Sequence, residues 1–240
     1  MSNTENKIAL ITGGNKGLGL EIARQLGVQG ITVVIGSRDP GRGAAAAQTL
    51  ISEGIDAHSV QLDVVNSEEI AALPAYFESK FGGLDILVNN AGVALEQGGS
   101  TVDNLRATYE ANVLGPFAVT EALLPLLKAS EAGRIVNHSS ILGSLGFIRT
   151  SEEITADWIL PGYSSSKAAL NMLTVVLSRK LDGTNVKVNS AHPGWVKTDL
   201  GGEQAPLEVT DGAKTAVRLA LLPADGPTGG FFHGDQELPW

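Results

Sequence analysis

Two residues in the second half of the chain, Tyr163 and Lys167, have the types and the spacing needed for proton transfer. They lie four positions apart in a stretch predicted to be helical, which places both side chains on one face. A free tyrosine titrates near ~10, and a close ammonium group lowers that pKa, each unit being worth about 1.4 kcal/mol. The pair could donate a proton; the alternative is an ordinary solvated helix surface.

A glycine-rich loop near the N-terminus has a spacing that suits phosphate binding. The segment reads Thr12-Gly13-Gly14-Asn15-Lys16-Gly17-Leu18-Gly19. Glycines let the backbone approach a pyrophosphate, whose charge sits at the positive N-terminus of the following helix. The chain has 29 glycines, so these alone could mark only a turn. The predicted strand before the loop and the helix after it favour dinucleotide binding.

Short apolar, β-branched runs alternate with longer amphipathic stretches along most of the chain, which is typical of βαβ units. The predicted strands cover residues 8–12, 31–36, 56–62, 84–89, 134–138 and 187–191, with a last short one at 230–233. The predicted helices cover residues 17–29, 42–52, 67–81, a broken pair across 102–130, 163–181 and 209–222. The sequence therefore predicts one α/β domain with a doubly wound parallel sheet in three layers.

In such a fold, ligands bind beyond the carboxyl ends of the strands, where the strand order reverses. The loops that should line the site are those after Thr12, Gly36, Leu62, Asn89, His138 and Ala191.

The composition disfavours several other classes of protein. The 240 residues carry a net charge of −9, which disfavours nucleic acid and anionic membrane as partners. There is no cysteine, and the four histidines are too scattered for a metal site, so no metal is expected. Core or rim packing is the expected role of His138 and His192. The polar N-terminus does not resemble a signal peptide and the apolar runs are too short to span a bilayer, so a cytoplasmic protein is expected.

Several motifs occur in the order found in the short-chain dehydrogenase/reductase family. These are the Gly-x3-Gly-x-Gly loop, Asn89-Asn90-Ala91-Gly92, Asn112, Ser140, the Tyr163-x3-Lys167 pair and the Pro193-Gly194 segment after the sixth strand. The chain resembles this family over essentially its whole length, and a Rossmann-type sheet is what the resemblance implies. Within the family it is most similar to the carbonyl reductase branch, through GGNKGLG, HPGWVKTDL and the terminal Trp240.

The resemblance implies reduction of a ketone or aldehyde by hydride transfer, with a catalytic tetrad. In that tetrad Tyr163 donates the proton, Lys167 lowers its pKa and holds the nicotinamide ribose, Ser140 binds the substrate carbonyl, and Asn112 holds a relay water. Ser139 is the rival serine, and Asn112 could instead mark a helix kink before Gly115-Pro116. The physiological direction could be alcohol oxidation, and a non-catalytic regulator could use the same fold.

The end of the second strand decides between the two nicotinamide cofactors. An arginine there accepts the 2′-phosphate of NADP, whereas a carboxylate bonds the 2′-hydroxyl of NAD. Ser37 and Arg38 occupy this point and Lys16 lies in the glycine loop, so NADP(H) is predicted. Asp39 would favour NAD if its side chain turned inward.

The resemblance also implies further cofactor contacts. Asp63 and Val64 would meet the adenine, Asn89 and Asn90 the adenosine ribose, and Val196 and Thr198 the nicotinamide carboxamide. Asp63 could instead cap the next helix, and the two asparagines could be turn residues.

An insertion of about 148–161 precedes Tyr163, and it is longer here than in most of the family. Ser151, Glu152 and Glu153 resemble a helix N-terminus, and Trp158 begins an apolar end that needs burial. We expect a short helix packed on its own subunit near the substrate mouth, rather than a surface loop. It would disfavour the family's usual tetramer, so a monomer is favoured and a dimer is possible.

Overall fold

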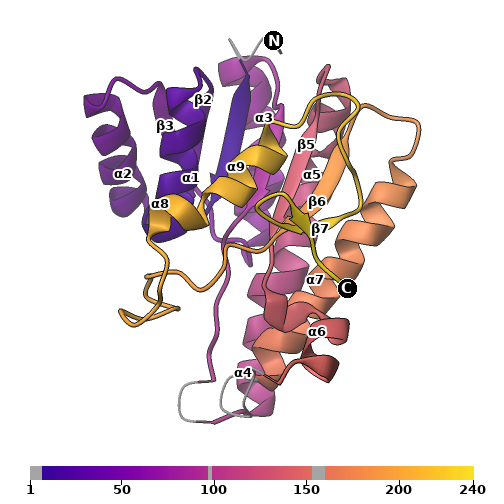
Figure 1. Cartoon of the computed structure of the whole chain (residues 1–240). Helices are drawn as coiled ribbons and strands as arrows, with labels where there is room; N and C mark the ends of the chain where they lie inside the picture. Colours follow the sequence, from indigo (N-terminus) through magenta and orange to yellow (C-terminus); the bar gives the residue numbers. More distant parts are fainter. Residues whose placement is uncertain (1–6, 97–98, 153–159) are drawn as a thin grey trace.

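The computed structural model describes residues 7–96, 99–152 and 160–240, and a mostly parallel sheet forms its centre (Figure 1). Within those ranges the eight strands follow the order β3-β2-β1-β4-β5-β6-β7-β8. Their bounds are β1 Ile8–Thr12, β2 Thr32–Ser37, β3 Ala57–Gln61, β4 Ile86–Asn89, β5 Arg134–His138, β6 Lys187–Ala191, β7 Phe231–His233 and β8 Gln236–Glu237. All neighbours pair in parallel except β7 and β8. The predicted doubly wound sheet is confirmed, and only β8 was not predicted.

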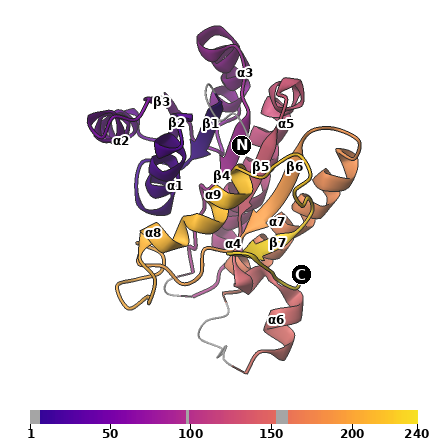
Figure 2. The ribbon, with the colours of Figure 1, turned by 45° about the horizontal axis from the view of Figure 1, so that its top comes forward.

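Helices cover both faces of the sheet, which confirms the three layers (Figures 1 and 2). Their bounds are α1 Gly17–Val28, α2 Pro40–Ser52, α3 Ser67–Phe81, α4 Val102–Tyr109, α5 Gly115–Ala129, α6 Leu145–Thr150, α7 Pro161–Lys180, α8 Val209–Gly212 and α9 Lys214–Ala220. Alternate residues of β1 face opposite layers, as strand geometry requires. Ala9 and Ile11 pack with α1, α2 and α9. Ile8 and Leu10 pack with α3, α5 and α7.

Two predicted helices have different boundaries in the structure. α7 begins at Pro161 rather than Tyr163, because proline has the dihedral angle of the first helical position and needs no hydrogen-bond partner there. The predicted helix 209–222 is divided into α8 and α9 around Ala213. The predicted break within 102–130 is a π-helical turn, η1, at Glu110–Leu114.

A helix that the sequence did not indicate begins just before the predicted insertion and ends within it. α6 covers Leu145–Thr150, and Ser144 caps it by accepting a hydrogen bond from Phe147 N (3.0 Å). Gly146 N donates to Trp240 O (2.8 Å), which joins α6 to the last residue. Ser151 ends α6. The rest of the predicted insertion helix, Trp158 included, lies on residues 153–159, outside the described residues, so its packing and its effect on assembly stay predictions.

The N-terminus of α3 shows which residue caps it, a question the sequence left open. Asn66 Oδ1 accepts hydrogen bonds from Glu68 N (3.0 Å) and Glu69 N (3.3 Å). Asp63 instead accepts from Val65 N (3.2 Å) in the preceding turn. The alternative that Asp63 caps this helix is therefore wrong, because Asn66 lies one residue before the first helical position and fills that role.

We expect Asn66→Ala to lower the free energy of unfolding by about 1 kcal/mol, the usual effect of losing an N-cap. Urea denaturation of the chain without cofactor measures the change. Ser67→Ala is the matched control, because it removes a neighbouring exposed hydroxyl and should change stability by less than about 0.5 kcal/mol. Equal losses in the two variants would contradict the assignment of the cap.

Candidate active site

Three of the predicted catalytic residues meet at the carboxyl end of β5. Lys167 Nζ donates to the main-chain oxygen of His138 (2.8 Å) and lies 5.6 Å from the centre of the Tyr163 ring. A side-chain hydrogen bond joins Ser140 to Tyr163. Tyr163 and Lys167 come from α7, and Ser140 directly follows β5. The packing of one helix against one strand end therefore brings these side chains together.

The structure distinguishes the two adjacent serines. Ser140 contacts the Tyr163 phenol, and its Oγ also accepts from Leu142 N (3.2 Å) at the start of the 3₁₀ turn η2, Ile141–Gly143. Ser139 is buried, and its hydroxyl has no hydrogen-bond partner in the described part of the chain. The contacts favour Ser140 over Ser139.

Asn112 lies within the π-helical turn η1 and is completely buried. Its Oδ1 accepts from Val93 N (2.8 Å), and its Nδ2 donates to Val93 O (2.8 Å) and Ser166 Oγ (3.0 Å). It therefore joins the loop after β4 to α7. The predicted helix break and the candidate site residue Asn112 therefore fall in the same π-helical turn, and such turns are common at functional sites.

Burial determines the protonation of the pair on α7. Burial raises the pKa of Tyr163 to about 12, although its hydrogen bond with Ser140 acts in the opposite direction. Burial lowers the pKa of Lys167 to about 8. The expected lowering of the phenol pKa by Lys167 is therefore not seen in the chain without cofactor. Desolvation raises this pKa more than the hydrogen bond with Ser140 lowers it.

The glycine loop packs closely against the segment that follows β4. Gly13 has a φ of +63°, and a Cβ there would lie 3.0 Å from Ala91 Cα, so only glycine fits. Asn90 holds the loop from the end of β4: its Nδ2 donates to Thr12 O (2.9 Å) and Gly13 O (3.2 Å). The structural alternative for Asn90 is thus supported.

Asn89 points into the protein interior. It is 2% exposed, and its Nδ2 donates to Thr120 Oγ1 (3.1 Å) and Asn137 Oδ1 (2.9 Å). This buried side chain is not positioned for the predicted ribose contact. Any such contact would have to come from the main chain, because the amide already bonds the neighbouring strand and α5.

The end of β2 presents one unpaired cation. Arg38 is exposed and forms no salt bridge with the described residues. Asp39 caps α2: its Oδ1 accepts from Arg42 N (3.0 Å) and its carboxylate lies 3.7 Å from Arg42 Nε. Ser37 is buried and its Oγ donates to Asp39 O (2.8 Å). The Asp39 carboxylate is therefore engaged at α2, which weakens the case for NAD.

The loop after β6 faces the glycine loop. Val196 is buried and bridges to Leu207, and Thr198 Oγ1 accepts from Gly201 N (3.1 Å). Lys16, on the glycine loop, forms a salt bridge with Asp199. Asp199 was not predicted as a partner of Lys16, because the two residues lie far apart along the chain.

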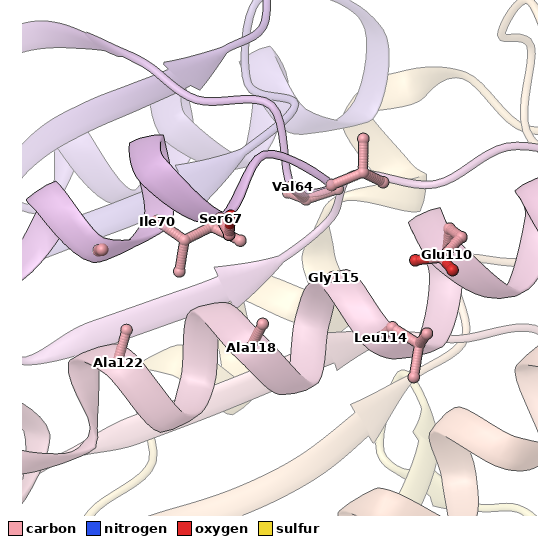
Figure 3. A pocket seen from close by; sticks show the side chains of 10 residues that line it. Val64, Ser67, Ile70, Glu110, Leu114, Gly115, Ala118 and Ala122 are labelled. Carbon is pink, nitrogen blue, oxygen red and sulfur yellow. The ribbon is translucent and has the colours of Figure 1, made fainter.

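A groove with a volume of about 290 Å³ lies between α3 and α5 (Figure 3). It is lined by Val64, Val65, Ser67, Ile70, Ala71, Glu110, Leu114, Gly115, Ala118 and Ala122. Of the predicted site residues only Val64 lines it, so this groove is distinct from the cluster around Tyr163.

Among the described residues, no group of side chains could hold a metal ion and no helix is long and apolar enough to cross a membrane.

The burial of His138 and His192 agrees with the packing role expected of them. His138 is 7% exposed, and its ring nitrogens have no hydrogen-bond partner within the described ranges. Burial lowers the pKa of His138 to about 3, with smaller contributions from Lys167 and His192. Burial likewise lowers the pKa of His192 to about 3. Both rings are therefore neutral at physiological pH.

We expect the chain without cofactor to lose stability as the pH falls from 6.5 towards 3. In this window the unfolded chain takes up protons on His138 and His192 that the folded chain does not bind. His138→Leu should reduce the slope of unfolding free energy against pH by up to about 1.4 kcal/mol per pH unit. Denaturation at several pH values measures this, and parallel curves for the two proteins would refute it.

Comparisons with known proteins agree with this geometry. The family model described as short chain dehydrogenase matches residues 7–208. Carbonyl reductase 1 (NADPH) of Mus musculus is 35% identical, over 99% of this chain and 100% of that protein. The (+)-neomenthol dehydrogenase of Arabidopsis thaliana is 36% identical, over 98% of this chain and 99% of that protein.

A solved structure is similar along nearly the whole chain. NADPH-bound carbonyl reductase from chicken fatty liver superposes with a TM-score of 0.86 at 28% identity, over 98% of this chain and 99% of that one. The match of the family model, the full-length relatives and the shared fold together establish that this chain belongs to the short-chain dehydrogenase/reductase family.

Proposed function

We propose that the chain reduces a ketone or aldehyde to an alcohol with NADPH, with Tyr163 as the proton donor. The observation that carries this proposal is the meeting of Tyr163, Ser140 and Lys167 at the carboxyl end of β5. Hydride transfer to a carbonyl builds negative charge on its oxygen, so the site needs a proton donor and groups that stabilise that charge. These three side chains supply both.

The roles follow from the protonation states. Because burial raises the pKa of Tyr163 to about 12, the phenol carries its proton at neutral pH and can donate it. Ser140, which already bonds the phenol, would donate a second hydrogen bond to the carbonyl oxygen. Lys167 holds a positive charge beside the ring and stabilises the phenolate left after proton transfer. Reduction requires a phenol that starts protonated, which agrees with this pKa.

Asn112 would act through the main chain of its π-helical turn. Both polar atoms of its side chain are engaged by Val93 and Ser166. We therefore assign the proposed relay water to the main chain of η1, with the side chain keeping this turn beside α7.

The residues at the cofactor edge fit NADPH. NADPH supplies the hydride when bound, and its pyrophosphate would lie on the glycine loop, where α1 presents its N-terminus. Arg38 and Lys16 would meet the 2′-phosphate. The exposed Arg38 has no competing salt bridge within the described ranges, whereas Lys16 would have to leave Asp199. The carbonyl reductases named above are NADPH enzymes by name or by bound cofactor, which supports the assignment.

Further residues would complete the cofactor site. Asp63 and Val64 follow β3 and would lie beside the adenine, and Asn15, Gly17, Leu18 and Gly19 complete the phosphate loop. Ser37 would support the 2′-phosphate site, and Val196 and Thr198 would hold the carboxamide.

The substrate class is tested with a panel of ketones, aldehydes, quinones and cyclic terpenoid ketones, followed by the loss of NADPH absorbance.

We expect Tyr163→Phe to abolish most turnover, because it removes the transferable proton and keeps the ring packing. NADPH affinity should survive, since the phenol is not proposed to hold the cofactor alone. Lys167→Ala should damage both kcat and NADPH affinity. Steady-state kinetics and a fluorescence titration of NADPH measure these effects, and a near-normal kcat for Tyr163→Phe would exclude Tyr163 as the acid.

We expect Lys16→Ala combined with Arg38→Ala to weaken NADPH binding by about tenfold or more and to affect NADH far less. A charge-assisted contact is worth about 1.5–3 kcal/mol, and only NADPH carries the 2′-phosphate. Lys180→Ala is the matched control, because it removes an exposed cation at the end of α7, away from the cofactor edge. A wild type that prefers NADH would show that Asp39 decides the specificity.

A further inference from the structure

A buried carboxylate lies against the helix that carries Tyr163. Glu96 is 6% exposed and comes from the loop that follows β4. Its Oε1 accepts from Gly162 N (2.8 Å) and its Oε2 accepts from Tyr163 N (2.9 Å). Ser100 Oγ donates a third hydrogen bond to Oε1 (2.7 Å). None of the roles assigned above involves Glu96.

Glu96 supplies the N-terminal cap that α7 lacks locally. Leu160 occupies the N-cap position and offers no side-chain acceptor. Proline has no N–H, so Pro161 needs no partner, and Ser164 N donates to Leu160 O (2.7 Å). The free amides of the first turn are then those of Gly162 and Tyr163, and the one carboxylate takes both.

The local chemistry suits a carboxylate at this point. Burial opposes ionisation of Glu96, but the hydrogen bonds from Gly162 N, Tyr163 N and Ser100 Oγ lower its pKa overall. A negative charge at a helix N-terminus is also favourable. Gly162 permits the close approach, because a Cβ there would lie only 3.3 Å from the Glu96 carboxyl carbon.

The position of Tyr163 depends on this cap. Tyr163 is the third residue of α7, in the turn where helices fray, and its side chain must reach Ser140 and lie beside Lys167. Lys167 lies one turn deeper and is anchored separately on the oxygen of His138. Loosening the first turn would therefore displace the phenol while leaving the ammonium group in place.

We propose that Glu96 is a positioning residue for the reaction, whose carboxylate clamps the first turn of α7 so that the Tyr163 hydroxyl stays beside Ser140. This inference rests on the proposed role of Tyr163 as proton donor. A displacement of about 1 Å at a reacting group can reduce the rate by about 100-fold.

The main test is Glu96→Gln, which keeps the shape but replaces one acceptor oxygen with an amide donor. We expect kcat to fall at least about tenfold, with the dissociation constant of NADPH within twofold of wild type, because Lys167 and the glycine loop are untouched. Two controls accompany it. Ser100→Ala removes the third bond to the same carboxylate and should keep kcat within twofold. Asn66→Ala removes a cap with the same number of amide bonds from α3 and should also keep kcat within twofold.

Hydrogen–deuterium exchange gives a readout that does not depend on activity. In Glu96→Gln the amides of residues 162–167 should exchange at least about fivefold faster, since an N-cap contributes about 1 kcal/mol. Asn66→Ala should accelerate exchange only in α3. Gly162→Ala is a second variant: it favours helix formation, yet its Cβ pushes the carboxylate by a few tenths of an ångström, so kcat should fall about threefold without loss of stability.

The outcomes separate this inference from the proposed function. If Tyr163→Phe loses turnover and Glu96→Gln keeps kcat within twofold of wild type, the clamp is refuted and the acid role of Tyr163 stands. A kcat loss in Asn66→Ala equal to that in Glu96→Gln would also refute the clamp, because the effect would then be general destabilisation. If Tyr163→Phe keeps its turnover, the proposed function itself fails.

Discussion

One buried ammonium group holds the candidate active site together. Lys167 is 4% exposed, and its Nζ donates to the main chain at the very end of β5. Burying a charge is unfavourable, which is why its pKa falls to about 8, and the hydrogen bond to His138 O offsets part of that penalty. Because an ammonium group has three donors and this carbonyl takes one, Lys167 keeps the capacity to bind a ligand hydroxyl. The same bond joins α7 to the end of β5 one turn from Tyr163.

The loop after β4 connects the cofactor edge to the chemistry. Its first part holds the glycine loop through Asn90, its middle binds Asn112 through Val93, and its last described part clamps α7 through Glu96. Three regions distant in sequence therefore depend on one short segment at the point where the strand order reverses, between β1 and β4. A shift of this loop on ligand binding would be transmitted to the phosphate cradle and to the proton donor together.

Much of the fold was predictable because its signals are local. Buried parallel strands are continuous apolar runs, and β1, β5 and β6 were predicted with the bounds that the structure shows. The misses have physical reasons. Asn66 rather than Asp63 caps α3 because it lies directly before the first helical residue, and the π-helical turn around Asn112 is joined to Val93 and Ser166 on other elements. The phenol pKa moved opposite to expectation because of burial, which the sequence does not report.

The sequence by itself determined the succession of strands and helices along the chain, the glycine loop, and the shared helical face of Tyr163 and Lys167. Each of these depends on residues a few positions apart, whose relation is set by the 3.6-residue period of a helix or the geometry of a turn. Only the tertiary structure decided that Asn89 faces the interior, that Asp39 is engaged at α2, and that Glu96 caps α7. These contacts join segments that come together only when the sheet is complete, so no local pattern of residue types could specify them.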